Sequence, residues 1–258
     1  MDAIETLVRK AVLEFKRSEN RRAAAMAVMV SRYYQKKVDP LSVKSINEWL
    51  DIVSPRIVAA SNTSAAEAAK FYDLLRRVQV GESPRVQYKA SPTLGVIDEG
   101  VRHSLAGAPM ERQKGIRPDA LKSSSIEGAV IRHVQAGGRQ TIHDNSARDR
   151  TCLGYVRVTK ASPCAFCAML ASRGISYRPY GEDSFQDSNR RFTGTGDAKV
   201  HDNCGCALKP VWSKDDPILA DNKRFEEMWG EWGVGTSREA MHNFMQQYRR
   251  HGGKLPSE

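Results

Sequence analysis

Two short clusters of cysteine and histidine constrain the fold of this chain more than any other feature of its sequence. Cys164 and Cys167 form a C-x-x-C pair, and His201, Cys204 and Cys206 follow further along the chain. Zinc is bound tetrahedrally by cysteine sulfur and histidine nitrogen, and the short loop of a C-x-x-C pair directs both sulfurs to one ion. The two clusters therefore predict a structural Zn²⁺ site made from these residues.

A tetrahedral ion needs one ligand fewer than the clusters offer, so the sequence leaves the ligand set open. A tight turn would present His201 and Cys204 to the same ion, whereas an extended segment would place Cys204 and Cys206 on one face. Three thiolates with His201 and a set of four thiolates are both compatible with this spacing. Two other interpretations remain at this point: cysteines buried as small apolar residues, or a redox or disulfide pair.

Apolar residues at helical spacing predict that both ends of the chain are helical. The expected fold class is α+β, with a predominantly helical N-terminal part and C-terminal tail around a small zinc-clipped module that contains β-strands. Repeated proline and glycine break the pattern between the first helices and the module. We expect four regions: a bundle-like helical region over 1–80, an irregular connecting arm over 81–120, the module over 121–212 and the helical tail over 213–258.

Helix boundaries follow from caps and breakers. Residues 3–37 read as one helix, and a second is expected to begin at Ser42 and to be interrupted at Ser54-Pro55. Ser64 is expected to cap a further helix. In the module, a helix over 125–135 is expected to end at Gly137-Gly138.

Alternating β-branched and apolar residues predict short strands in the module over 154–159, 175–178 and 207–212, with a short helix over 168–172 and a polar loop over 181–199. A β unit this small has little apolar content of its own. Such units usually need an additional stabilising crosslink, and a bound metal ion supplies one. This is the physical reason for preferring a metal site to isolated buried thiols.

A polar segment precedes the first of these strands. It contains Arg139, His143, Asp144, Arg148 and Asp149, which would form a salt-bridge network on a helix or, alternatively, an acid/base or anion-binding cluster. We favour a structural network that braces the metal module.

The overall charge and the cysteine content limit the environment of the protein. A net charge of +10 favours an acidic partner, with nucleic acid the leading case, although a solubilising surface explains it equally well. Clustered cysteines indicate a reducing compartment, and Cys152, which lies apart from both clusters, is expected to be a buried thiol. The N-terminal segment does not resemble a signal peptide, and no apolar run is long enough to span a membrane.

Three blocks of the module resemble the MuF-like minor capsid proteins of tailed bacteriophages, particularly an actinobacteriophage branch in which some members are labelled capsid maturation proteases. The blocks are GRQTIHDNSARDR, GYVRVTKASPCAFCAMLASRG and VHDNCGCALKPVW, and the likeness is specific between about residues 128 and 212. The general family favours C-P-x-C and H-P-x-C-R-C. Here Ala165 and Asp202 replace the prolines and Gly205 replaces the arginine, whereas the cysteine and histidine positions match.

The resemblance implies a head morphogenesis protein that occurs in few copies beside the portal and takes part in head assembly and in DNA packaging or ejection. Expected partners are portal and capsid or scaffold proteins and, without sequence specificity, double-stranded DNA. The expected location is the capsid interior, after assembly in the host cytoplasm.

The alternative function is a capsid maturation protease that processes scaffold or major capsid protein. Its nucleophile would be Cys164 or Cys167, with His201 or His143 as the base, or else a serine, although no elbow motif marks one. These are largely the atoms that a metal would occupy, so we expect no enzymatic activity.

Overall fold

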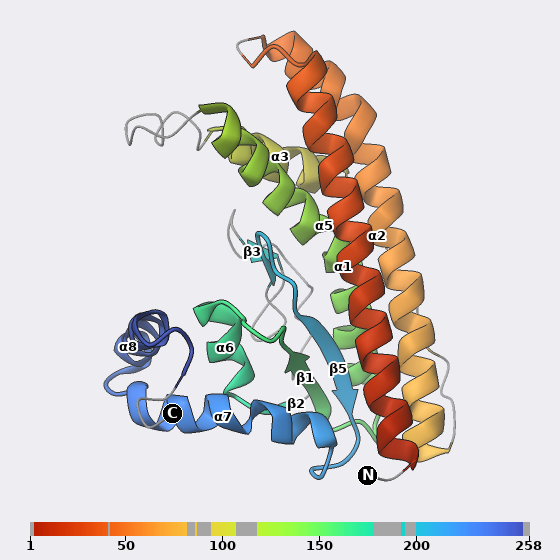
Figure 1. Cartoon of the computed structure of the whole chain (residues 1–258). Coiled ribbons are helices and arrows are strands. Elements are labelled where there is room, and N and C mark those ends of the chain that lie inside the picture. The colour runs from red at the N-terminus through yellow and green to blue at the C-terminus, as the bar shows by residue number, and fades with distance from the viewer. Residues whose placement is uncertain are drawn as a thin grey trace.

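A computed structural model describes residues 3–40, 42–81, 86, 94–106, 118–177, 192–193 and 200–254 of the chain. The fold is α+β, as predicted, with mostly helical structure around small antiparallel sheets. Its largest part is a long hairpin of α1 (Ala3–Lys37) and α2 (Val43–Val80), which lie side by side along their whole lengths (Figure 1).

Two more helices pack on this hairpin. Helix α5 (Pro118–Arg148) lies along α1 and α2, and α3 (Leu94–Ala106) packs beside the upper part of α5 (Figure 1). Their common apolar core contains Val30, Trp49, Leu50, Val53, Ile57, Ile97, Val101, Ile126, Val130 and Val134. Burial of the apolar helix faces that these residues form, more than helix propensity, stabilises such long helices.

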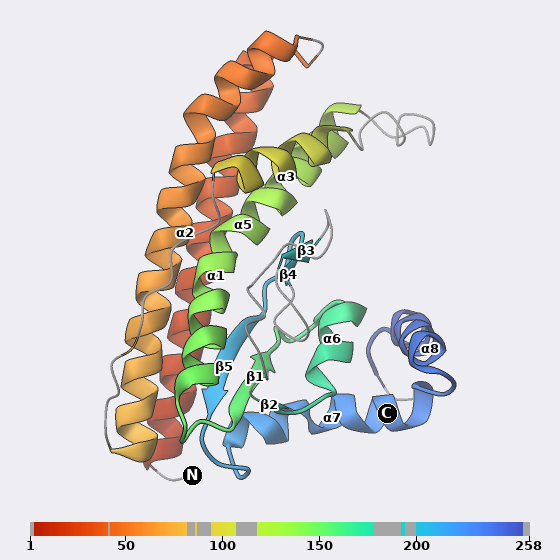
Figure 2. The same cartoon turned by 180° about the vertical axis from the view of Figure 1, so that it is seen from behind.

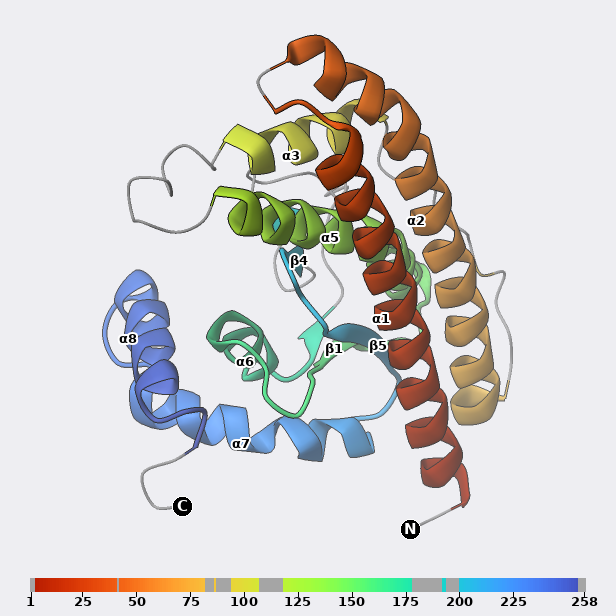
Figure 3. The ribbon, with the colours of Figure 1, turned by 45° about the horizontal axis from the view of Figure 1, so that its top comes forward.

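The main sheet has the strand order β2-β1-β5 and is antiparallel throughout. Its strands are β1 (Gly154–Val158), β2 (Ser176–Tyr177) and β5 (Ala207–Val211). A separate pair joins β3 (Phe192–Thr193) to β4 (Val200–His201). Every residue of β1 and β5 is buried, because the helical hairpin and α5 cover one side of the sheet and α6 and α7 the other (Figures 2 and 3).

The C-terminal part is a group of three helices, namely α6 (Ala165–Ala171), α7 (Pro217–Trp232) and α8 (Ser237–Arg250). They share an apolar core that includes Met169, Leu170, Phe225, Met228, Trp232 and Phe244. Helix α7 is capped by Asp216, whose carboxylate accepts the backbone N–H of Ile218 at 3.1 Å. This group of helices lies apart from the tip of the α1–α2 hairpin (Figure 1).

The first helix and the start of the second were predicted correctly, but the breaks inside the second were wrong. Ser42 caps α2 by accepting the backbone N–H of Ser45 at 3.2 Å. The helix then continues through Ser54-Pro55 and Ser64 without a break. Ser64 is buried within it, and its hydroxyl donates to Glu19 of α1 and accepts the backbone N–H of Gly138 at 3.1 Å. A tertiary contact, not a helix cap, therefore explains this serine.

The predicted end of a helix at Gly137-Gly138 was also wrong, since α5 passes through both residues. Glycine is needed there for close packing of α5 on α2. A Cβ atom at Gly137 would collide with the backbone carbonyl of Ser61, and the Gly137 N–H donates to the Ser61 hydroxyl at 3.2 Å. The two glycines thus set the distance between helices.

The strands of the module are close to their prediction. The expected strands over 154–159, 175–178 and 207–212 correspond to β1, β2 and β5, and the expected helix over 168–172 begins earlier, at Ala165. Within the predicted arm over 81–120, the described structure includes α3 and the start of α5. The predicted polar loop over 181–199 lies outside the described residues except for β3.

A buried polar hub ties the foot of the hairpin to the sheet. The Asp149 carboxylate, just after α5, accepts hydrogen bonds from Arg76 at 2.8 Å, Trp212 at 3.1 Å and Tyr72 at 3.2 Å, and it also binds Thr151. Burial opposes ionisation of this group, but the hydrogen bonds from Arg76, Thr151 and Trp212 outweigh it and lower the pKa of Asp149 to about 2.

The glycine contact predicts that Gly137→Ala destabilises the fold. The added methyl group must push α2 and α5 apart, which costs about 1–3 kcal/mol for an overpacked core. Urea unfolding measures the change. The matched control is Gly230→Ala in α7, where an added Cβ atom meets nothing within 4 Å. Because alanine has a better helix propensity than glycine, this substitution should raise the free energy of unfolding by up to about 1 kcal/mol. Equal effects of both substitutions would contradict the packing argument.

The Asp149 hub predicts a pH-dependent loss of stability. Because its folded-state pKa lies below the unfolded value, Asp149 stabilises the protein above about pH 4 and loses this contribution, about 2 kcal/mol, as the pH falls towards 2. Asp149→Asn removes the carboxylate charge opposite the buried Arg76 and should cost several kcal/mol at neutral pH, roughly 3–5. The gap between wild type and variant in the free energy of unfolding should narrow by about 2 kcal/mol between pH 5 and pH 2. A gap that stays constant with pH would refute this assignment.

Candidate metal centre

Three of the predicted ligands meet in the interior of the protein. The Sγ atoms of Cys167, Cys204 and Cys206 all lie within 4.8 Å of one another, and the three side chains are buried. Cys167 and Cys204 are separated by 3.5 Å between sulfurs. Zinc–sulfur bonds of about 2.3 Å in a tetrahedron place neighbouring sulfurs roughly 3.8 Å apart, so this group could bind a metal ion with little movement.

The first helix of the C-terminal group supplies one thiol to this cluster and holds another beside it. Cys164 caps α6, and its Sγ accepts the backbone N–H of Cys167 at 3.4 Å. Cys167 lies in the first turn of the helix and points into the cluster, whereas Cys164 is exposed. The C-x-x-C pair therefore approaches the cluster from a helix start, with one sulfur inside and the other at the edge.

The loop between β4 and β5 supplies the remaining two thiols and is held by one face of α5. Gly128 and Arg132 lie against its start: a Cβ atom at Gly128 would come within 2.9 Å of the Asp202 side chain, and Arg132 pairs with Asp202 at 2.9 Å. Asn203 has a φ of 60°, a left-handed conformation that asparagine tolerates better than most residues. This turn directs the chain towards Cys204.

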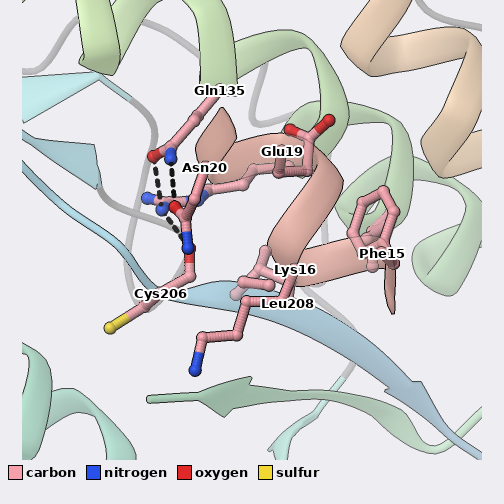
Figure 4. A pocket seen from close by; sticks show the side chains of 10 residues that line it. Phe15, Lys16, Glu19, Asn20, Gln135, Cys206 and Leu208 are labelled. Atoms are coloured by element: carbon pink, nitrogen blue, oxygen red, sulfur yellow. Dashed lines mark hydrogen bonds between the residues drawn. The ribbon is translucent and has the colours of Figure 1, made fainter. Parts of the chain in front are cut away.

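A chain of polar contacts continues along α5 to the thiols. Gln135 donates to Asn20 of α1 at 2.9 Å, and Asn20 donates to the Gly205 carbonyl at 3.2 Å. Arg139 donates to Gln135 at 3.0 Å, to the Cys204 sulfur at 3.4 Å and to the Cys206 carbonyl. Figure 4 shows Asn20 and Gln135 meeting beside Cys206. The loop with both thiols is thus fixed to two helices of the bundle.

Burial and neighbouring thiols raise the pKa of two of the clustered cysteines. Hydrogen bonds with Cys164, Cys204 and Cys206, together with burial, raise the pKa of Cys167. For Cys206, the hydrogen bond with Cys167 lowers the pKa, but the contact with Cys204 and burial outweigh it, so the pKa rises to about 11. Metal binding would displace these protons, because the thiolate is the ligand.

A second arginine lies beside the cluster. Arg157 of β1 is 3 % exposed. Burial opposes its charge, but its interactions with Cys167, Cys204 and Cys206 keep the pKa of Arg157 above its ordinary value. Neither this residue nor the contact of Arg139 with the thiols was predicted from the sequence.

Of the two other predicted ligands, Cys164 lies exposed beside the cluster, and only the backbone of His201 is described. The backbone of His201 lies in β4, and its side chain is outside the described residues. Cys152 is buried, as predicted, and its thiol donates to the Gly154 carbonyl at 3.1 Å, apart from the three clustered cysteines.

The predicted polar cluster of residues 139–149 does not form one site. Arg139 contacts the thiols, whereas His143 pairs with Asp144 at 2.9 Å and packs near the ring of Tyr155. Asp149 belongs to the hub at the foot of the hairpin, and Arg148 is exposed. These side chains point from α5 and its end to different parts of the fold.

Sequence reasoning missed the face of α5 that holds the ligand loop. Gly128, Arg132, Gln135 and Arg139 recur at intervals of four, three and four residues, which places them on one side of a helix. The expected helix end at the two glycines concealed this pattern, because it separated Arg139 from the other three.

Comparisons with known proteins agree on a phage origin. The family described as VG15 protein matches residues 7–232 of this chain. The Gene 15 protein of Mycobacterium phage D29 is 25 % identical over 240 residues, which cover 83 % of this chain and 85 % of that protein. No solved structure matches the chain. Among the described helices, none is both long enough and apolar enough to cross a lipid bilayer.

The matched region includes the α1–α2 hairpin, α5, the sheet, the clustered cysteines and α7. The chain belongs to the VG15 protein family, a family of bacteriophage proteins.

Proposed function

We propose that this protein is a minor capsid protein of the MuF-like type, which acts beside the portal in head assembly and in DNA packaging or ejection. One observation carries the proposal. The three sequence blocks that resemble MuF-like proteins, at 138–150, 154–174 and 200–212, come together around the thiol cluster as the end of α5, β1 with α6, and β4 with β5. The resemblance therefore covers a spatial unit as well as separate motifs.

The proposed role of this unit is structural: a zinc ion crosslinks two parts of the fold. We call this crosslink the zinc clip. Cys167 enters from α6, which packs on α7 and α8, while Cys204 and Cys206 enter from a loop fixed to α1 and α5. An ion bound to all three would connect the C-terminal helices to the bundle. Proposed partners are portal and capsid or scaffold proteins, and the net charge of +10 favours additional non-specific contact with DNA.

The chemistry of the cluster gives less support to a protease. A cysteine nucleophile acts as a thiolate and must be reached by its substrate. Cys167 is 1 % exposed, which shields it from a substrate, and its neighbours and burial raise the pKa of its thiol, which disfavours the thiolate. Both properties suit a ligand that ionises only on metal binding.

The proposal predicts that the protein is a low-copy component of the head. Quantitative mass spectrometry of virions and of DNA-free proheads, from the phage that encodes this chain, should find it in both, at a small fraction of the copy number of the major capsid protein. Deletion of its gene should yield capsids with impaired DNA content or delivery. Absence of the protein from proheads and virions would refute a structural role in the head.

Co-expression with scaffold and major capsid protein separates this role from proteolysis. We expect no cleavage of either protein. Cleavage that occurs with the wild-type chain and disappears with a folded Cys167→Ala variant would contradict the structural proposal and favour a protease.

The proposed clip predicts that metal removal weakens the connection between the C-terminal helices and the bundle. Protein purified without chelators should contain about one zinc per chain. Free zinc at a thousand times its dissociation constant stabilises the folded protein by about 4 kcal/mol, so a chelator should lower the Tm accordingly.

Hydrogen exchange locates this effect. When the metal is removed, the protection of backbone amides against exchange should fall most in α6 and in residues 202–206. It should fall least in the part of α2 that packs on α1. A metal-free preparation with an unchanged Tm, or a uniform loss of protection over all helices, would contradict the clip.

A further inference from the structure

The exposed face of α1 has an open groove that, among the described residues, this helix alone lines. The groove lies on residues 24–37, which form the upper part of the helix towards the tip of the hairpin (Figure 1). Its volume is about 690 Å³. Ala24 and Val28 are exposed, whereas Met29 and Tyr33 are half-buried against the core of the bundle.

The residues of this groove recur at the spacing by which one helix packs on another. Ala25, Val28, Arg32 and Lys36 follow one another at intervals of three or four residues and therefore lie on one side of α1. The small side chain of Ala25 permits close approach, and the flexible side chain of Met29 adapts to a partner. Val28 is 41 % exposed, so this apolar stripe is not covered within the described part of the chain.

The charged side chains of the groove are all positive. Residues 20–38 contain no aspartate or glutamate. Arg32, Lys36 and Lys37 line the groove and are exposed, and none of them forms an ion pair with another residue that the structure describes. These three cations are therefore available to attract a negatively charged partner.

The combination of an apolar stripe and positive charge distinguishes between possible occupants. Duplex DNA matches the charge, but contacts to its phosphates would leave Val28 and its apolar neighbours uncovered. A second copy of the chain, related by a twofold axis, would place the same basic side chains against one another. An amphipathic helix with acidic residues beside its apolar stripe matches both properties.

We propose that residues 24–37 of α1 form a docking site for an acidic amphipathic helix of another protein. Apolar side chains of that helix pack on Ala25 and Val28, and its carboxylates pair with Arg32 and Lys36. Because these pairs are exposed, they select the partner more than they strengthen its binding. The inference rests on the proposed function for the source of the partner, which is another protein of the phage head.

Photo-crosslinking from Val28 tests the site. The photoreactive residue p-benzoylphenylalanine replaces Val28 in the full-length chain, and heads assembled with this chain are irradiated and analysed by mass spectrometry. We expect a crosslink to a segment of another head protein whose apolar residues recur at helical spacing beside aspartate or glutamate. The matched control has the same group at Leu13, which is 48 % exposed on the same helix but outside the groove. It should give no crosslink to that segment.

Several outcomes of this experiment would overturn the docking site. A crosslink to DNA would assign the face to nucleic acid, and a crosslink to a second copy of the chain would assign it to self-association. The same crosslink from Val28 and Leu13, or none from Val28 although the chain is present in the heads, would also refute the site. Absence of the chain from the heads would refute the proposed function as well, so the mass spectra distinguish the two failures.

Charge reversal tests the acidic character of the partner. The crosslinked segment is synthesised as a fluorescent peptide, and its anisotropy during titration with the purified full-length protein gives the Kd. Arg32→Glu combined with Lys36→Glu should weaken binding at least about tenfold, because two attractive pairs become repulsive. The matched control, Lys10→Glu with Arg17→Glu, changes the net charge equally at exposed positions of α1 outside the groove and should leave the Kd unchanged.

Circular dichroism and the Tm of each variant separate a folding defect from a binding defect. Equal losses of affinity in both folded double variants would show that only the overall charge acts, and would contradict the site. Binding that is insensitive to Arg32→Glu with Lys36→Glu would contradict the acidic partner.

Discussion

The contact between α5 and the loop of residues 202–206 determines where the thiols lie, and the rest of the candidate site depends on it. The loop has no regular structure of its own and is held by Gly128, Arg132 and Arg139 on one face of the helix. Arg139 belongs to that face only because α5 continues through Gly137-Gly138, where it packs closely on α2. Helix packing in the bundle therefore fixes the position of Cys204 and Cys206, which are distant from α5 in the sequence.

A bound ion would add a connection that apolar packing supplies only in part. The upper part of the bundle and the C-terminal helices have separate apolar cores, whereas a third core joins the lower part of the bundle to the sheet and to Ile218 of α7. The cysteines lie between the bundle and the C-terminal helices. Thiols from both sides meet there next to two buried guanidinium groups. Thiolates bound to a metal would add negative charge beside these guanidinium groups. The buried thiol group and its surroundings are the physical basis for proposing a structural metal at the site.

Much of the fold could be predicted from the sequence, because local patterns determine it. The apolar stripe of residues 3–37, the cap at Ser42 and the β-branched run at residues 154–158 gave the correct elements. The errors arose where tertiary contacts override local signals. Ser64 resembles a helix cap but binds Glu19 and Gly138, and Gly137-Gly138 resemble a helix end but serve close packing. Likewise, no local pattern distinguishes Arg157, a buried side chain in a strand, from an exposed one.

In the proposed role, a long helical hairpin and a compact thiol-containing module would form one rigid component of the phage head. Zinc K-edge X-ray absorption of the protein, purified without added metal or chelator, tests the central claim most directly. The account predicts a shell of at least three sulfur scatterers at about 2.3 Å. A nitrogen or oxygen contribution at about 2.0–2.1 Å would show that a ligand other than cysteine completes the site. Absence of zinc from the folded protein would contradict the metal centre altogether.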